Sequence, residues 1–343
     1  MFLRGILCSL LICFIQCSQL TEAKFKNEKL DQNLVFGLLL SGIDLQTIAA
    51  VRIGALPNQT PGSDSDTSAQ ISLGEKIFKD KSLSLNGVQS CSTCHLLTGR
   101  NAGTDAQSTS RGTLGQVGRR NALSIFNVGF QETLFWDGRI NTLEDQALMP
   151  FVDQNEMSLP SISELINRLN TNSDYVQLFA QAFPDSPNIS TSHIKKSISA
   201  FERSLITPSR FDEFIKGDNL ALNIAEKQGL RLFLDLNCIK CHQGHMLGGG
   251  KFVKLDSVFS YNNQDLGRYE FTLNESDKYF FRTPSLRNVA LTAPYFHDGS
   301  VSTLTEAVRR MNHYESPRTI SESEILILVN FLKTLSDKPR SLL

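Results

Sequence analysis

Two absences narrow the class of protein before any motif is considered. The 343-residue chain has a formal net charge of only −1, so nothing indicates the basic face that a nucleic-acid-binding protein needs. It also has no cysteine to spare for a structural disulfide, because three of its seven cysteines lie in an apolar N-terminal run and the other four form two short motifs. The length and the 41% apolar content suit two ordinary globular domains.

The two short motifs are copies of C-x-x-C-H, the attachment sequence of c-type haem. In such a motif the thiols form thioethers with the haem vinyl groups, and the adjacent histidine binds the iron. A single C-x-x-C also fits a thioredoxin-like redox pair or half of a zinc site, but histidine follows both copies and no second C-x-x-C lies close enough to complete a zinc ribbon. The sequence therefore predicts two haem c groups, attached through Cys91, Cys94 and His95 and through Cys238, Cys241 and His242.

Haem c is attached outside the bacterial cytoplasm, so the chain needs an export signal. Residues 1–23 provide one, since Arg4 precedes an apolar core of ten residues, from Ile6 to Ile15, and a polar stretch that ends at Ala23. This run is short for a membrane span. Cys17 leaves a second interpretation open, a lipoprotein cleaved before this cysteine and lipid-anchored through it. Both interpretations predict a periplasmic protein.

The remaining chain divides by composition and by an internal repeat. Residues 24–68 are predicted to be an extension and a linker, because 58–68 is rich in Pro, Gly, Ser and Asp. Two haem domains are predicted at 69–208 and 209–343. Each has a G-x-x-x-F-x-D stretch ahead of its haem motif, an Asp-Gly pair downstream and a threonine helix N-cap five residues after that aspartate. The sequence thus predicts a mostly α-helical fold of two cytochrome c-like haem domains related by internal duplication.

The repeat register gives the two haems different roles. Thirteen residues after Asp298 stands Met311, and thirteen after Asp137 stands Pro150. A methionine sulfur ligates haem iron and raises its reduction potential, whereas proline has no ligand atom. This predicts a closed His/Met C-terminal haem for electron transfer and an N-terminal haem with an open iron that can bind peroxide. The alternatives are that Met311 is a core methionine, or that Met246 is the ligand instead, although it follows His242 by only four residues.

These features, with several further stretches between about Leu73 and Leu335, resemble the bacterial di-haem cytochrome c peroxidases and their MauG-type relatives. The stretches include 135–139 (FWDGR), Gln146, 156–157 (EM), 248–250 (GGG) and 283–299 (TPSLRNVALTAPYFHDG). The resemblance implies that His95 is the proximal ligand of a peroxidatic haem, and that His242 and Met311 ligate an electron-transfer haem.

The resemblance also implies a pocket over the N-terminal haem. Glu156 would be the distal acid and base that moves a proton between the peroxide oxygens. Without the resemblance, the sequence favours a solvated carboxylate at the start of a helix. Gln146, Phe135 and Pro150 would line the same pocket. Trp136, the only tryptophan, would lie between the haems as a core anchor or an electron relay.

A calcium ion between the domains is a further implication of the resemblance. Its ligands would be the Asn121 side chain and the backbone carbonyls of Thr292 and Pro294, with waters, in keeping with the preference of Ca²⁺ for oxygen. Members of the family are often homodimers, and the sequence neither supports nor contradicts that for this chain.

One departure from the family concerns a histidine. Many di-haem peroxidases have a His in the loop after the first haem motif, where it blocks the iron until the other haem is reduced. The corresponding residues 111–118 contain none, which predicts a haem that reacts with peroxide without prior reduction.

MauG-type enzymes have Tyr where Met311 stands, which places this chain on the peroxidase side. The predicted function is reduction of H₂O₂ with electrons from a small cytochrome c or cupredoxin; the alternatives are a MauG-like protein-modifying oxidase and a non-enzymatic electron carrier or sensor.

Overall fold

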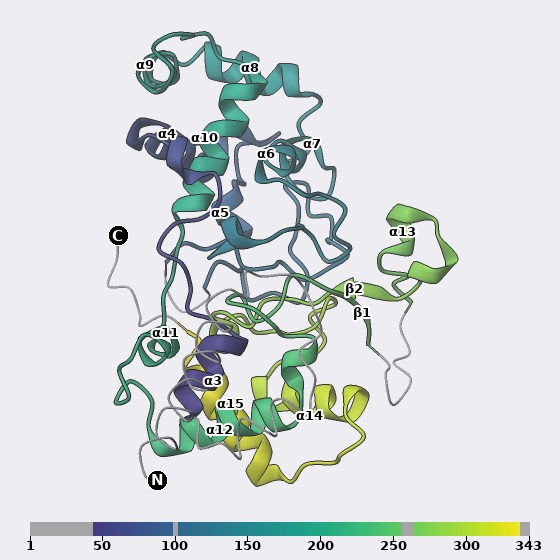
Figure 1. Ribbon diagram of the computed structural model, residues 1–343. Coiled ribbons are helices and arrows are strands. Elements are labelled where there is room, and N and C mark those ends of the chain that lie inside the picture. Colours follow the sequence, from purple (N-terminus) through teal and green to yellow (C-terminus); the bar gives the residue numbers. More distant parts are fainter. Residues whose placement is uncertain (1–43, 99–101, 256–263, 337–343) are drawn as a thin grey trace, which may run out of the picture. The chain divides into compact units, whose positions relative to one another are not determined.

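The computed structural model describes residues 44–98, 102–255 and 264–336; the predicted export signal and Cys17 lie outside these ranges. The regular secondary structure of the described chain is helical apart from one small sheet, and long loops join the helices (Figure 1). Its α-helices are α3 (Leu45–Arg52), α4 (Ser68–Lys79), α5 (Cys91–Cys94), α6 (Leu143–Gln146), α7 (Met149–Val152), α8 (Ile162–Asn170), α9 (Ser173–Ala182), α10 (Thr191–Ser204), α11 (Arg210–Ile215), α12 (Ile224–Asp235), α13 (Tyr269–Thr272), α14 (Leu304–Glu315) and α15 (Glu322–Lys333).

Short 3₁₀ helices and one antiparallel strand pair complete the described structure. The 3₁₀ helices are η1 (Ser63–Ser65), η2 (Lys81–Leu83), η3 (Val128–Phe130), η4 (Cys238–Lys240), η5 (Glu275–Asp277) and η6 (Val289–Leu291). The strands are β1 (Phe252–Lys254) and β2 (Phe280–Arg282), with Val253 opposite Phe281. The mostly α-helical fold predicted from the sequence is confirmed. None of the helices in the described ranges has the length and apolar character that crossing a membrane requires.

Each half is built around one close helix crossing. In the first half α4 meets α10 at Gly74, where a Cβ atom would lie 1.9 Å from the carbonyl oxygen of Ser197. In the second half α12 meets α15 at Gly229, where a Cβ atom would lie 2.3 Å from the carbonyl oxygen of Ile327. Only glycine lets the two backbones approach this closely. The equivalent glycines of the sequence repeat therefore make the same packing contact in both halves.

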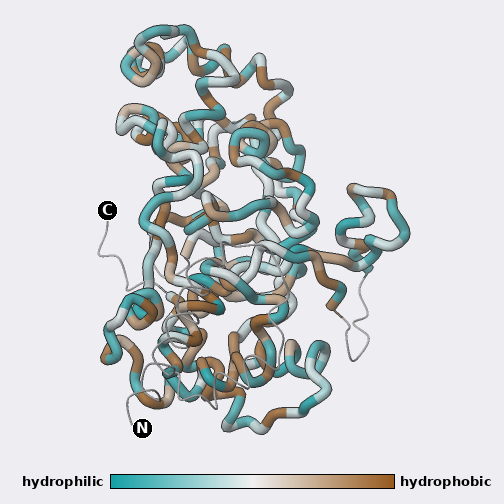
Figure 2. The backbone as a smooth tube through the Cα atoms, viewed as in Figure 1, coloured by the Kyte–Doolittle hydropathy of each residue, from teal (hydrophilic) through white to brown (hydrophobic). Residues whose placement is uncertain are grey.

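The core of each half lies under these crossings. Apolar and polar residues alternate along the helices in Figure 2, as expected where one face of a helix is buried. In the first half the fully buried side chains include Leu73, Ile77, Phe151, Leu165, Tyr175 and Phe179. In the second half, Phe331 of α15 lies against the rings of Phe211 and Phe233, with centroids 5.5 and 5.3 Å apart.

The duplication also extends to unusual backbone conformations. Phe135 and Phe296 both have positive φ angles, 64° and 68°, and the glycines three residues later, Gly138 and Gly299, have φ of 63° and 60°. Positive φ is uncommon for a phenylalanine. Its recurrence at the same repeat position shows that the two halves share one loop geometry, so the duplication inferred from spacing is confirmed.

The two halves meet symmetrically at Thr207. Asn127 and Asn288 precede η3 and η6, both in the left-handed conformation. Their side-chain amides donate to the same hydroxyl, Thr207 Oγ1, at 2.7 and 2.8 Å. The segment that follows α10 thus ties equivalent residues of the two copies together, and Thr207 is fully buried there.

The segment 45–68 departs from the expectation of an extension and a linker. Ile48 and Ala49 of α3 are buried, and the backbone N–H of Leu56 donates to Asp212 Oδ1 at 2.7 Å. Further on, Asp66 forms an ion pair with Arg203 at 2.6 Å. Parts of the segment 45–68 therefore pack against the folded body, which was expected to begin near residue 69. Most residues of 58–68 are exposed, as their polar composition indicates, but the Leu56 N–H and the Asp66 carboxylate bind buried partners elsewhere in the chain.

Candidate active site

A cavity of about 660 Å³ lies against the first haem motif and extends to residues of the second half. Cys91, Cys94 and His95 line it. So do the four predicted pocket residues, which are Phe135, Gln146, Pro150 and Glu156, and Trp136. The three predicted calcium ligands, Asn121, Thr292 and Pro294, also line it. The structure thus brings together residues that are spread over two hundred positions of sequence. Cys238, Cys241, His242 and Met311 do not line this cavity.

Local hydrogen bonds fix the first motif. Ser90 is the N-cap of α5, and its backbone N–H donates to Thr93 Oγ1 at 3.0 Å. The chain leaves the helix at His95, whose Nδ1 lies 3.1 Å from the carbonyl oxygen of Gly103. A donor bond from Nδ1 fixes the tautomer and leaves Nε2 to bind a metal.

The second motif has the same arrangement. Cys238 begins η4, and His242 is buried with Nδ1 3.1 Å from the carbonyl oxygen of Leu247. Met311 lies on α14, a helix on which no described residue is fully buried. The apolar side chains at 304, 307, 308 and 311 follow helical spacing and are each half-buried. Such a half-covered apolar stripe fits a flat apolar group such as a porphyrin.

Two buried arginines add a cationic side to the cavity. The side chain of Arg282 donates to the carbonyl oxygen of Phe135 at 2.9 Å and to Gln131 Oε1 at 2.8 Å, both neutral acceptors. Burial lowers the pKa of Arg282 to about 10, although the charge of Asp137 acts to raise it. Arg287 is 3% exposed and forms an ion pair with Asp212 through Nη1, but among the described residues its Nη2 has no hydrogen-bond partner. Buried cations that face a cavity fit an anionic group, and haem carries two propionate carboxylates, so the residues present fit haem c.

Glu156 lies in the turn after α7 and faces the cavity. Burial raises its pKa to about 7, with a further rise from the charge of Asp153 and an opposing effect of Arg139. The hairpin of residues 111–117 contacts this turn, because the N–H of Thr113 donates to the carbonyl oxygen of Glu156 at 2.7 Å. Gly112 lies so close that a Cβ atom would be 2.4 Å from the carbonyl oxygen of Asn155. The carboxyl group is thus held on a fixed backbone with a pKa near neutrality.

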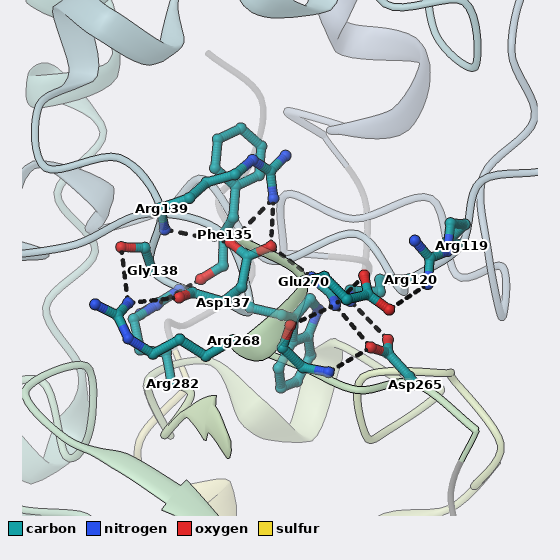
Figure 3. Close-up of polar contacts among 12 residues, drawn as sticks. Arg119, Arg120, Phe135, Asp137, Gly138, Arg139, Asp265, Arg268, Glu270 and Arg282 are labelled. Atoms are coloured by element: carbon teal, nitrogen blue, oxygen red, sulfur yellow. Dashed lines mark hydrogen bonds and ion pairs between the residues drawn. The ribbon is translucent and has the colours of Figure 1, made fainter. Parts of the chain in front are cut away.

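An ionic network holds the segment that contains Phe135 and Trp136 (Figure 3). Asp137 binds Arg139 Nη1 through both oxygens, at 3.0 and 2.8 Å, and the Arg139 guanidinium lies 3.5 Å from the centre of the Phe135 ring. Asp137 also accepts from Arg120 at 2.7 Å, and Arg120 makes two 2.7 Å bonds to Asp265 in the second half. Both halves therefore fix the orientation of the pocket aromatics.

Family models and known proteins match both halves of the chain. The family model for di-haem cytochrome c peroxidase matches residues 68–220, and the cytochrome c model matches residues 226–336. A cytochrome c551 peroxidase of Pseudomonas aeruginosa is 40% identical over 78% of this chain and 79% of its own. A cytochrome c551 peroxidase of Nitrosomonas europaea is 38% identical over 78% and 80%.

The chain belongs to the di-haem cytochrome c peroxidase and MauG family. It is an oxidoreductase of the cytochrome c peroxidase class. Among solved structures, a MauG-like protein associated with microbial copper homeostasis superimposes with a TM-score of 0.72 at 32% identity, over 82% of this chain and 95% of that one. Membership implies two haem c groups, in agreement with the fit of the residues described above.

Residues 111–118, in which the family resemblance led us to look for a blocking histidine, form the hairpin that contacts the Glu156 turn. Here it is closed by a bridge between Arg111 and Val117 and has no histidine. Of the chain's six histidines, only His95 lines the cavity. His193, the next along the chain, stacks on Phe183 with centroids 4.0 Å apart.

The family's calcium site stays a prediction for this chain. The backbone N–H of Asn121 donates to the carbonyl oxygen of His297 at 2.7 Å, which brings Asn121 beside the loop of Thr292 and Pro294. The Asn121 side-chain nitrogen donates to the carbonyl oxygen of Gln107 at 2.9 Å, which leaves its oxygen as the atom that would face a cation.

Sequence reasoning missed several residues of the site. Arg120 and Asp265 are 145 residues apart, and nothing in their local sequence links them. Glu202 also lines the cavity; helical spacing could have found it, because it lies one turn after the buried Ile198 on the same face of α10.

Proposed function

We propose that the protein reduces hydrogen peroxide to water in the periplasm, with two electrons from a small external donor such as a cytochrome c or a cupredoxin. The observation that carries the proposal is Glu156, a carboxyl with a pKa raised to about 7 that faces the same cavity as the first haem motif. An acid–base group works best when its pKa lies near the operating pH. An electron carrier does not need such a group.

In this proposal Cys91, Cys94 and His95 hold one haem c, and Cys238, Cys241, His242 and Met311 hold the other. Haem supplies an iron that binds peroxide and passes single electrons. The protein residues do the remaining work. The Glu156 carboxylate takes a proton from one peroxide oxygen and returns it to the other, and Gln146 and the Phe135 ring position the peroxide and limit its contact with water.

The contrast between Pro150 and Met311 supports an open iron in the first half. Helix α14 runs unbroken from Leu304 through Met311. In the first half the corresponding helix is interrupted, since α6 ends at Gln146, four residues before Pro150. A proline lacks the N–H that would bond to that carbonyl and its ring clashes with it. Pro150 thus both interrupts the helix and provides no sulfur.

The position of Trp136 supports an electron relay between the halves. It is 8% exposed, and its indole N–H donates to the carbonyl oxygen of Asn121 at 2.9 Å. Its ring packs edge-on against His297, the residue at the equivalent repeat position, with centroids 6.3 Å apart. The backbone N–H of Arg282 also donates to the Trp136 carbonyl oxygen at 2.7 Å.

The finer parts of the proposal rest on the sequence and on the family resemblance. The division between the haem domains lies near residue 208, and the absence of a histidine in 111–118 implies that peroxide reacts without prior reduction of the protein. Calcium binding, lipid anchoring through Cys17 and a homodimer belong to the same set of proposals. A MauG-like oxidase of another protein is the second candidate, supported by the MauG-like structural relative and opposed by Met311.

Electron paramagnetic resonance of the ferric protein, before and after one equivalent of H₂O₂, tests the proposal. We expect one high-spin and one low-spin haem, with the high-spin signal reacting at once. Glu156→Gln should slow peroxide reduction by roughly 10²- to 10⁴-fold while haem content and reduction stay unchanged. The exposed Glu132 provides the control, Glu132→Gln. Two low-spin haems that are inert to peroxide would contradict the proposal and favour an electron carrier.

A further inference from the structure

A second carboxyl group faces the cavity of the first half. Glu202, on α10, is 5% exposed and lines the cavity together with Ile198. Its Oε2 is buried and has no hydrogen-bond partner among the described residues. Native proteins seldom leave a buried polar atom without a partner, because its desolvation then goes uncompensated. This arrangement calls for a role other than packing.

The charged groups around Glu202 do not neutralise it. Arg203 is the nearest cation along the helix, but its guanidinium binds Asp66 at 2.6 and 2.9 Å and Glu144 at 2.6 Å. Burial raises the pKa of Glu202 to about 8. The charge of Arg203 acts to lower this pKa, and the charge of Glu144 acts to raise it. The carboxyl group is therefore protonated at neutral pH.

Glu202 shares its surroundings with the distal carboxyl group. Burial raises the pKa of the Cys91 thiol, and the charges of Glu202 and Glu156 both add to the rise. The two carboxyls thus lie within electrostatic reach of the same haem-attachment sulfur. They approach it from different elements, one from α10 and the other from the turn after α7.

The duplicated fold provides an internal comparison. The Cβ atom of Phe201 lies 2.9 Å from the Cβ position of Gly74, and that of Phe331 lies 2.7 Å from the Cβ position of Gly229. This register pairs Glu202 with Leu332, which is 6% exposed. The second half fills the position with an apolar side chain, so the helix crossing does not require a carboxyl. It occurs only in the half that contains Pro150 in place of a methionine.

We propose that Glu202 is a proton reservoir for the peroxide site, and that its carboxylic acid supplies one of the two protons consumed per peroxide. The inference rests on the proposed function. Breaking the O–O bond and forming two waters takes up two electrons, from the external cytochrome or cupredoxin, and two protons. Glu156 only moves a proton from one oxygen to the other, so both consumed protons come from elsewhere. One comes from Glu202, which regains its proton from solvent, and the other comes from solvent directly.

The reservoir predicts a spectroscopic signature that does not depend on turnover. Infrared spectra of the resting holoprotein should contain the C=O stretch of a protonated carboxylic acid that shifts in D₂O and disappears as the pH rises through about 8. This band should be absent in Glu202→Gln and in Glu202→Leu. It should persist in Glu144→Gln, the matched control, whose side chain is 40% exposed and bonds the neighbouring Arg203.

Kinetics then separate the two carboxyls. The first reaction of the resting protein with one equivalent of H₂O₂ needs no net proton uptake, so Glu202→Gln should leave its rate unchanged, whereas Glu156→Gln should slow it. The donor-dependent return to the resting spectrum takes up two protons, and Glu202→Gln should slow it by roughly 10²-fold, at the low end for a positioned acid.

Glu202→Leu, which copies the residue of the second half, should give the same pair of results. A wild-type return rate in both Glu202 variants, with Glu156→Gln impaired, would overturn the reservoir and leave the proposed function standing. A Glu156→Gln variant that turns over normally would overturn both.

Discussion

Asp212→Asn removes the negative partner of the most deeply buried ion pair among those described. Asp212 Oδ2 lies 2.5 Å from Arg287 Nη1, and the two side chains are 2% and 1% exposed. The carboxylate also accepts from the N–H of Ser209 at 2.8 Å and from that of Leu56 at 2.7 Å. The substitution leaves the Arg287 guanidinium buried without its counter-charge. Breaking such a pair from one side costs about 3–5 kcal/mol.

The pH dependence of this effect has a definite sign. Burial acts to raise the pKa of Asp212, but Arg287 and the N–H donors outweigh it and hold the pKa below its usual value. The unfolded chain, with a pKa near 3.9, therefore binds the proton more readily than the folded one. The contribution is fully present above about pH 4 and is lost as the pH falls through the lower, folded pKa. The difference between wild type and Asp212→Asn should thus be full at pH 7 and shrink in acid.

Thermal unfolding of the holoprotein, followed by circular dichroism at pH 7, measures this effect. A loss of 3–5 kcal/mol corresponds to a fall in Tm of about 6–20 °C for a domain of this size. Glu213→Gln is the control, since Glu213 is the exposed neighbour of Asp212 on the same helix. An Asp212→Asn variant that melts with the control, or a difference that grows towards acid pH, would refute the reasoning.

Three further predictions concern the haem ligands, the distal acid and the fold. Met311→Ala should abolish the low-spin signal of the second haem, seen by electron paramagnetic resonance, whereas Met246→Ala should not. The stopped-flow rate of reaction with peroxide should rise with pH to a plateau above about 7, because the pKa of Glu156 is raised to about 7 and its deprotonated form accepts the proton; a profile unchanged in Glu156→Gln would exclude this assignment. Gly74→Ala should destabilise the protein to thermal unfolding by about 1–3 kcal/mol through overpacking, but Gly250→Ala should not, since nothing lies within 4 Å of its Cβ position.

Features that depend on short-range spacing could be predicted from the sequence. The haem motifs and the glycines at the helix crossings recur at matching positions, so comparing the halves was enough to find them. The N-caps Thr142 and Thr303 accept hydrogen bonds from Asp145 N–H and Glu306 N–H at 3.1 and 3.2 Å, as the sequence predicted. In each case the physical cause acts within one or two turns of chain.

Contacts between distant segments could not be predicted in this way. The bonds of Arg120 to Asp265 and of Leu56 to Asp212 span 145 and 156 residues. Both depend on how distant segments pack in the folded chain, and a single sequence contains no local pattern for such packing. The packing of segment 45–68 could not be predicted for the same reason, because the Leu56 N–H and the Asp66 carboxylate bind partners 156 and 137 residues away.

The duplication explains how one fold can provide two different haem sites. The positions that set the packing are the same in both halves, as at Gly74 and Gly229, since a change there would disturb a whole helix crossing. The positions that differ face inward without supporting that crossing. Pro150 replaces a methionine and interrupts its helix, and Glu202 replaces the apolar Leu332 with a protonated acid. The helix crossing is the same in both halves, so it does not determine whether a copy of this domain reacts with peroxide or only passes electrons. We expect side chains such as Pro150 and Glu202 to determine this difference.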